Sequence, residues 1–312
     1  MSNLIKKPSE LVVKSTVKML IYGQPGSGKS TVALSAPNPL LLDFDGGVQR
    51  VNAAFQCPTL QVNNWEEVQQ VLSEDLSEYR TLVIDTAGKM LDYMTEYIIR
   101  KDSRMGMRDG SLQLKGYGVR KTMFINFLKQ VSLLGKHIVF VAHDKEDKDG
   151  DKRFIRPEIR GSSSNDLVKE LDLVGYLQII GNDRTVCWNP AENYYAKNCC
   201  SLEPFSKLSV VLDAFGGKIA NNDFLTKVFE RYDQYLNQQK QIGIDYKSLL
   251  DKGRSIVEQT KDVDTFNNAL KELSALNVIW DSKLQINEFV KAKAKELNLV
   301  YNKESKKYEA AV

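Results

Sequence analysis

Residues 23–30, with the sequence GQPGSGKS, constrain the fold more than any other part of the chain. They follow the apolar run VKMLIY (17–22), precede the helical pattern KSTVALSA (29–36), and match the spacing of a phosphate-binding loop. The glycines let the backbone curl so that its N–H groups point at phosphate oxygens, and the helix N-terminus adds the positive end of its dipole. A chance glycine turn is the alternative. The predicted nucleotide-binding residues are Gly23, Gln24, Pro25, Gly26, Ser27, Gly28, Lys29, Ser30 and Thr31.

Further side chains are expected to complete a site for a metal-bound triphosphate. Lys29 would bring a positive charge to the β- and γ-phosphates, and the Ser30 hydroxyl would bind Mg²⁺. A carboxylate on a neighbouring strand is also needed, and Asp85 ends the apolar run RTLVID with that placement. The alternative is that Asp85 caps the next helix, a function that Thr86 could share. We therefore predict Ser30 and Asp85 as metal-binding residues.

Polar side chains also end two other strand-like runs. Asp43 and Asp45 close LLLDFD, and strand alternation puts both on one face with Phe44 on the other. Carboxylates at the carboxyl ends of parallel strands line the ligand crevice, where one can orient or deprotonate a water. An acidic turn before two glycines is the alternative. His143 closes KHIVFVAH and would sense the γ-phosphate, although a histidine at a strand end is often structural.

Strand-like apolar runs alternate with helical patterns up to about residue 143, which predicts a mostly parallel sheet covered by helices on both faces. A second strand pair, 171–180 and 184–189, is joined by the tight turn GND and predicts a hairpin at the sheet edge. From about residue 222 the pattern is helical. We interpret 238–244 (QQKQIGI) as a polar linker, and 245–300 as three helices without a strand signal.

The expected organisation is therefore an α/β core over residues 1–236 and a small all-helical C-terminal domain over 237–312. The chain has 312 residues with 43 basic and 40 acidic side chains, so its net charge does not by itself indicate nucleic-acid binding. No signal peptide or membrane span is evident, and no cysteine spacing suggests a disulfide framework. We expect a soluble protein of the cytoplasm with reduced cysteines: Cys57, Cys187, Cys199 and Cys200.

The chain resembles the RecA-type recombinases, most closely the phage-encoded RecA-like ATPases that accompany or perform single-strand annealing. The resemblance covers about residues 16–212 and rests on GQPGSGKS, LLLDFD, TLVID, IVFVAHD, GSSSNDLVKELDLVGYL and KNCCSLEPF. It implies a RecA-like P-loop NTPase core that binds ATP and Mg²⁺ and assembles as a filament or ring. It gives Asp45 the position of the catalytic carboxylate, usually Glu, and His143 that of the γ-phosphate sensor, commonly Gln. Lys197 takes the place of a lysine that acts on the neighbouring subunit's nucleotide, and Cys199 replaces a second one.

The same resemblance implies two loops that hold single-stranded DNA, at about 101–116 and 144–165. Residues 100–121 hold seven basic side chains against two acidic ones, close to Tyr117, which suits phosphates and a stacked base. The second loop is acidic first and basic later. A solvated charged surface is the alternative for both. The predicted DNA-binding residues are Arg104, Arg108, Lys115, Lys152, Arg153, Arg156 and Arg160.

We expect an ATP-binding, Mg²⁺-dependent ATPase that acts on single-stranded DNA in phage recombination or annealing, in the host cytoplasm. One alternative is a P-loop NTPase that acts as a switch or remodelling module on protein partners without touching DNA. Another is a nucleotide-binding scaffold that does not hydrolyse ATP. The C-terminal helices could dock a single-strand-binding or replication protein, or only cap the core.

Overall fold

The structure, a computed structural model, describes residues 16–149, 152–159 and 163–311. The chain divides into two compact units, a core unit that ends at Tyr235 and a C-terminal unit that begins at Leu236.

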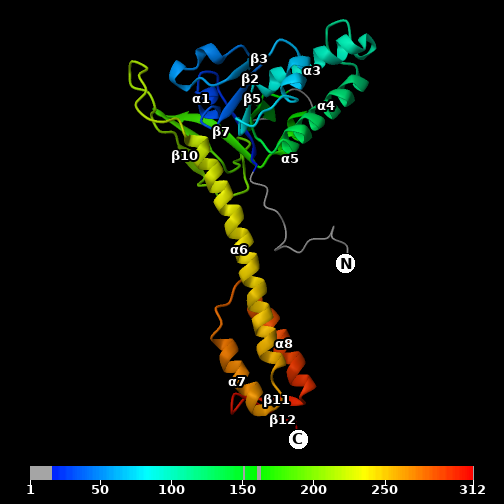
Figure 1. Cartoon of the computed structure of the whole chain (residues 1–312), viewed down its shortest axis with the longest axis vertical. Coiled ribbons are helices and arrows are strands. Elements are labelled where there is room, and N and C mark those ends of the chain that lie inside the picture. The colour runs from blue at the N-terminus through cyan, green and yellow to red at the C-terminus, as the bar shows by residue number, and fades with distance from the viewer. Residues whose placement is uncertain (1–15, 150–151, 160–162, 312) are drawn as a thin grey trace. The chain divides into compact units, whose positions relative to one another are not determined.

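The core unit is built on a sheet of ten strands, of which six are parallel neighbours (Figure 1). These strands are almost continuously apolar, as expected for strands that are buried on both faces. In their order across the sheet they are β7 (Leu173–Ile180), β1 (Lys18–Gly23), β5 (His137–Asp149), β4 (Thr81–Asp85), β2 (Pro39–Asp43) and β3 (Thr59–Gln61).

Helices cover this sheet because right-handed crossovers join its parallel strands. One hydrophobic cluster joins Leu20, Leu42 and Phe140 of the sheet to Met90 and Phe124 of the helices. The mostly parallel α/β core predicted from the sequence is therefore confirmed. The helices that follow the strands are α1 (Lys29–Ala33), α2 (Trp65–Val71), α3 (Ala87–Lys101), α4 (Leu114–Leu133) and α5 (Ser163–Glu170).

The remaining strands of the sheet are antiparallel. The predicted hairpin is confirmed: β7 pairs with β8 (Asp183–Cys187) through a two-residue turn in which Gly181 has φ 61°. β8 also pairs with β10 (Phe205–Lys207), and the short β9 (Lys197–Asn198) pairs with β7.

The prediction of a loop from residue 144 onward was wrong for its first part. β5 continues to Asp149 and pairs with β6 (Lys152–Pro157) as a second hairpin. Opposite charges on facing strands stabilise this ladder, since Arg153 pairs with Glu146 and Arg156 with Asp147. The sequence lacks the apolar alternation that would have announced these strands.

The C-terminal unit is mainly helical, as predicted, but it is not all-helical. The prediction of a polar linker at 238–244 is wrong, because this segment is part of the helix α6 (Phe224–Glu258). Its Gln and Lys residues are good helix formers, which offset the cost of one glycine. The other elements are α7 (Val263–Ser274), α8 (Ser282–Glu296) and an antiparallel hairpin of β11 (Leu299–Asn302) and β12 (Lys307–Ala310).

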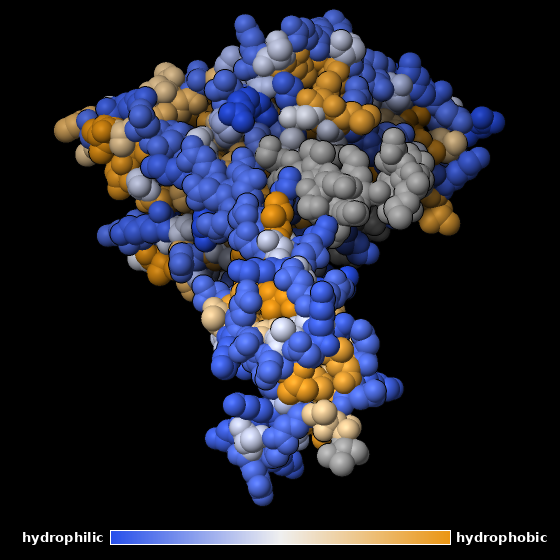
Figure 2. Space-filling view, turned by 60° about the horizontal axis from the view of Figure 1, so that its bottom comes forward, coloured by the Kyte–Doolittle hydropathy of each residue, from blue (hydrophilic) through white to orange (hydrophobic). Residues whose placement is uncertain are grey.

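The C-terminal unit has a small hydrophobic core of its own. Val257, Phe266, Val290, Ala294 and Leu299 are its buried residues, so α6, α7, α8 and β11 all contribute to it. None of the described helices, in either unit, is long and apolar enough to cross a membrane. Hydrophilic residues predominate on the face in Figure 2.

Candidate nucleotide-binding site

The segment between β1 and α1 forms a curled loop that depends on its glycines. Gly26 and Gly28 have φ angles of 76° and 96°, which side-chain-bearing residues adopt with strain. A Cβ atom on Gly23 would lie 2.2 Å from the carbonyl oxygen of Leu177 on the neighbouring strand β7. Both the curl and the close approach to β7 therefore require glycine.

The ammonium group of Lys29 lies within this curl. Its Nζ donates a hydrogen bond of 2.7 Å to the carbonyl oxygen of Gln24, across the loop. Burial lowers the pKa of Lys29, while the nearby carboxylates of Asp144 and Asp85 raise it. The hydroxyl of Ser27 is buried and has no hydrogen-bond partner among the described residues. A positive charge and an unpaired polar atom in one glycine loop fit a phosphate group.

Ser30 and Asp85 meet at the base of the loop. The Ser30 hydroxyl donates a hydrogen bond of 2.5 Å to Asp85 Oδ2, although the two residues are 55 positions apart. Burial raises the pKa of Asp85, while its hydrogen bond from Ser30 lowers it. The helix-capping function belongs to Thr86, whose hydroxyl accepts the N–H of Lys89 at 3.4 Å. Asp85 is therefore free to act with Ser30 on a metal ion.

The two carboxylates that follow β2 have different partners. The Asp43 carboxylate accepts the N–H groups of Gly47 and Val48, each at 3.0 Å, and so holds the turn into the 3₁₀ helix η2 (Val48–Arg50). The contacts of Asp43 therefore support the alternative interpretation, in which this residue belongs to an acidic turn. Asp45 forms an exposed ion pair of 2.7 Å with Arg50. Both carboxylates raise the pKa of Asp85, so both lie at its end of the sheet.

His143 lies beside the loop. In the register of β1 and β5 it is the direct neighbour of Gly23. Its Nδ1 atom is buried and, within the described residues, has no hydrogen-bond partner. The position suits a group that senses a phosphate, and that function stays a prediction.

Comparison with known protein families finds one that accounts for this geometry. Residues 15–200 match the model of a family described as "AAA domain". The chain belongs to the AAA domain family. A comparison with curated proteins finds no match. Among solved structures it is similar to the flagellar accessory protein FlaH from Methanocaldococcus jannaschii, with 11% identity and a TM-score of 0.35 over 65% of this chain and 89% of that one.

The AAA domain of this chain has the fold of a P-loop ATPase. β5 lies between β1, which leads into the phosphate loop, and β4, which carries Asp85. The loop, Lys29, Ser30, Asp85 and His143 all lie at the carboxyl ends of these strands, where open α/β sheets bind ligands. Among the described residues, no group of three or more His, Cys, Asp or Glu side chains could hold a metal ion by itself.

Lys197 of the AAA domain lies far from its own phosphate loop. It pairs with Val174 near the start of β7, whereas Gly23 pairs with Leu177 further along the strand. Its Nζ atom donates a hydrogen bond to the carbonyl oxygen of Leu171, away from the loop. The contacts of Lys197 are therefore directed away from its own phosphate loop, and its action on a neighbour's nucleotide stays a prediction.

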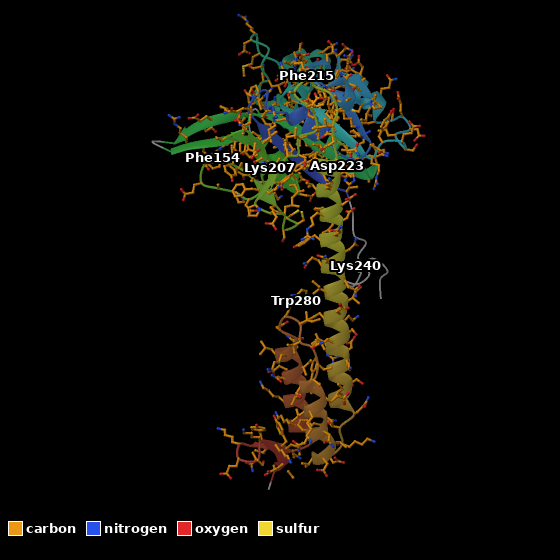
Figure 3. All side chains as sticks on the ribbon, turned by 90° about the vertical axis from the view of Figure 1, so that its left-hand side faces the viewer. Phe154, Lys207, Phe215, Asp223, Lys240 and Trp280 are labelled. Carbon is orange, nitrogen blue, oxygen red and sulfur yellow. The ribbon has the colours of Figure 1, made fainter. Side chains whose placement is uncertain are left out.

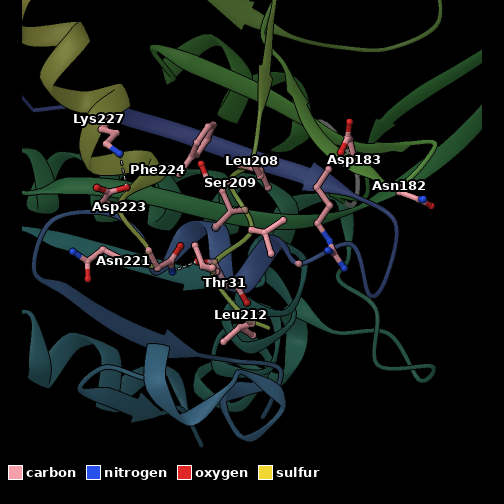
Figure 4. Close-up of a pocket in the computed structure, with 16 residues that line it drawn as sticks. Thr31, Asn182, Asp183, Leu208, Ser209, Leu212, Asn221, Asp223, Phe224 and Lys227 are labelled. Carbon is pink, nitrogen blue, oxygen red and sulfur yellow. Dashed lines mark hydrogen bonds and ion pairs between the residues drawn. The ribbon is translucent and has the colours of Figure 1, made fainter. Parts of the chain in front are cut away.

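A cavity of about 290 Å³ adjoins the loop and extends the site (Figure 4). Thr31 of α1 lines it on the phosphate side, and the Asn222 side chain donates a hydrogen bond of 2.7 Å to the Thr31 carbonyl oxygen. Leu208, Leu212 and Phe224 supply apolar walls. A pocket of mixed polar and apolar lining beside a phosphate loop is suited to a nucleobase and its ribose. Sequence reasoning missed it because its walls come from segments more than 150 residues apart.

Two charged residues beside the loop were also missed. Asp144 follows His143 and lies close enough to Lys29 to raise its pKa. Arg184, on β8, donates a hydrogen bond of 3.0 Å from Nε to the carbonyl oxygen of Ser27. No motif marks either residue, since only the pairing of the strands brings them to the loop.

The first segment predicted to bind DNA is an ordered loop between α3 and α4. The N–H of Met107 donates a hydrogen bond of 2.7 Å to the carbonyl oxygen of Ser111, and this bond closes a tight turn. Arg104 forms an ion pair of 2.9 Å with Asp102. The side chains of Arg108 and Lys115 are exposed, as are the apolar Met107, Leu114 and Tyr117.

The second segment predicted to bind DNA has fewer uncompensated charges. Arg153 and Arg156 of β6 pair with acidic residues of β5, and the Arg156 guanidinium lies 5.1 Å from the centre of the Phe154 ring. Figure 3 labels Phe154 on this hairpin. Only the backbone of Lys152 is described, and Arg160 lies outside the described residues.

Proposed function

We propose that this protein is an ATP-binding, Mg²⁺-dependent ATPase of the phage RecA-like kind, which acts on single-stranded DNA in recombination or annealing in the host cytoplasm. The observation that carries the nucleotide part is the 2.5 Å hydrogen bond between Ser30 and Asp85 beneath a loop with Lys29 inside its curl. A hydroxyl and a carboxylate at this place are the ligands that a protein supplies to a magnesium–triphosphate site.

Different residues of the chain would have separate functions in hydrolysis. Backbone N–H groups of the loop and Lys29 would hold the phosphates, and Ser30 and Asp85 would bind Mg²⁺, which supplies charge neutralisation when bound. The Asp45 carboxylate would orient a water, after exchanging its exposed ion pair with Arg50 for that contact. His143 would donate a hydrogen bond from its ring to the terminal phosphate.

The surface of the loop between α3 and α4 supports the action on DNA. Arg108 and Lys115 are exposed cations, and the exposed ring of Tyr117 has the Arg120 guanidinium 5.1 Å from its centre. Cations and an exposed aromatic ring in one part of the chain suit the phosphates and bases of a single strand. The ion pairs of Arg153 and Arg156 reduce the free positive charge of the second loop. The second candidate function is a switch module that acts on protein partners without binding DNA. We include in the proposal that the two units are separate domains, and that the C-terminal unit docks a replication or single-strand-binding protein.

The proposal also includes a homo-oligomer. Lys197 donates its hydrogen bond away from its own loop, and we propose that a neighbouring subunit of a filament or ring binds beside it. In such an assembly it would stabilise charge that develops on the neighbour's nucleotide.

A binding experiment separates the two candidate functions. Fluorescent single-stranded DNA is titrated with the protein and Mg²⁺, with and without a slowly hydrolysed ATP analogue. Wild-type protein should bind in an ATP-dependent way, Lys29→Ala should lose ATP binding, and Arg108→Ala with Lys115→Ala should weaken DNA binding about 10-fold or more because two phosphate contacts are lost. Lys129→Ala, which removes an exposed charge on α4, is the control. ATP binding without any DNA binding would favour the switch module, and ATP binding that survives Lys29→Ala would refute the nucleotide site.

A further inference from the structure

Arg184 is a cation beside the phosphate loop that no motif assigns. It comes from the hairpin of β7 and β8, which runs along the flank of the loop opposite β5. Leu177 pairs with Gly23, the last residue of β1, and β7 then continues for three residues to Ile180. Arg184 pairs with Ile179 in this extension, so the sheet carries it past its carboxyl edge to the level of the loop.

The side chain of Arg184 is oriented by the loop itself. Its Nε donates to the Ser27 carbonyl oxygen at 3.0 Å, and it packs against Gly28, where an added Cβ would lie 3.6 Å from Nε. Because the guanidinium is planar, this one hydrogen bond also limits where its two Nη groups can point. Those Nη groups make no hydrogen bond or ion pair to any other described residue.

The charges around Arg184 leave it available for an anion. The neighbouring Asp183 forms an ion pair of 2.7 Å with Lys207 of β10, and does not neutralise it. Lys227, the other basic residue in the lining of the cavity, is paired with Asp223 at 2.9 Å (Figure 4). Of the described residues that line the cavity, Arg184 is thus the one with an uncompensated positive charge, and it lies next to Gly28 at the rim of the phosphate loop.

We propose that Arg184 contacts the phosphate groups of the bound nucleotide, as a second cation of the site beside Lys29. This inference rests on the proposed nucleotide binding. The apolar residues of the cavity, Leu208, Leu212 and Phe224, suit the base instead, which leaves the charged rim at Gly28 for the phosphates. Guanidinium groups favour such a place because their paired N–H donors match two oxygens of one phosphate.

The test compares two ligands that share phosphates but not a base. Affinities for ATP and for inorganic tripolyphosphate are measured with Mg²⁺ for wild type, Arg184→Gln and Arg184→Lys. The Gln variant should weaken both ligands about 10-fold or more, since a hydrogen bond to a charged group is lost. The Lys variant should recover part of that loss because it keeps the charge. Lys129→Ala, which removes an exposed charge on α4, should leave both affinities unchanged.

Other results would overturn the inference. Weaker binding of ATP with normal binding of tripolyphosphate would mean that Arg184 stacks on the base. A Gln variant with lower thermal stability without ligand, and no recovery in the Lys variant, would mean that Arg184 only supports the loop. Unchanged affinities in all variants would remove it from the site. If wild-type protein binds neither ligand, or if Lys29→Ala binds both normally, the proposed nucleotide binding itself fails.

Discussion

His137 gives the structure a stability that depends on pH. It begins β5, is 6% exposed, and its Nδ1 atom accepts the backbone N–H of Val17 at 3.0 Å. Its ring stacks on Phe229 with centroids 4.6 Å apart. Nδ1 can accept this hydrogen bond only without a proton. Burial, together with the positive charge of Arg80, lowers the pKa of His137 from 6.5 to about 4.

The sign and size of the effect follow from the two pKa values. The folded-state pKa lies below the unfolded-state pKa, so between them the unfolded chain binds a proton that the folded chain does not. The contribution of His137 to the free energy of unfolding is therefore complete above about pH 6.5 and is lost as the pH falls towards 4. The full pKa difference corresponds to about 3 kcal/mol, of which about 2 kcal/mol would be lost between pH 7.5 and pH 5.

His137→Asn isolates this contribution. An Asn side chain still offers an oxygen to the N–H of Val17, but it does not titrate. The free energy of unfolding is measured with urea at pH 7.5 and pH 5, followed by the fluorescence of the buried Trp65 and Trp188. Between these conditions wild type should lose about 2 kcal/mol more than the variant, because other titrating groups act equally in both proteins. Equal losses in the two proteins would refute the reasoning.

Three further predictions concern the loop, hydrolysis and assembly. Gly23→Ala should destabilise the core unit by about 1–3 kcal/mol in urea denaturation, because its Cβ would lie 2.2 Å from a backbone oxygen of Leu177. As a control, Gly243→Ala has open space around its Cβ in the middle of α6 and should stabilise the protein by up to about 1 kcal/mol. Asp45→Asn should keep ATP affinity and lower the hydrolysis rate about 100-fold in a steady-state assay; normal turnover would remove Asp45 from the mechanism. ATPase activity per monomer should rise with protein concentration and with single-stranded DNA. Lys197→Ala should lose this rise, and mixing that variant with Lys29→Ala should restore part of the activity. Activity per monomer that does not change with protein concentration would indicate a monomeric enzyme.

Part of the fold was predictable because its signals are local. The apolar runs of β1, β2, β4 and β5 and the helical patterns between them predict the parallel sheet from the spacing of neighbouring residues. The hairpin of β5 and β6 was not predictable in the same way. Its strands are held by ion pairs across the ladder, and a strand of charged residues has the composition of a loop. The continuous α6 was missed because helix propensity in its polar middle outweighs the glycine that suggested a linker.

The sequence by itself determined the phosphate loop, its lysine and serine, and the strand that ends at Asp85, because all of these depend on residues that are close in the chain. Only the tertiary structure decided which other side chains reach that loop. Strand pairing places His143 beside Gly23 and brings Arg184 to Ser27 from more than 150 residues away, while it turns Lys197 away from the loop. The physical reason is that a sheet aligns strand ends by hydrogen-bond register, and register between distant segments depends on packing that no short stretch of sequence records.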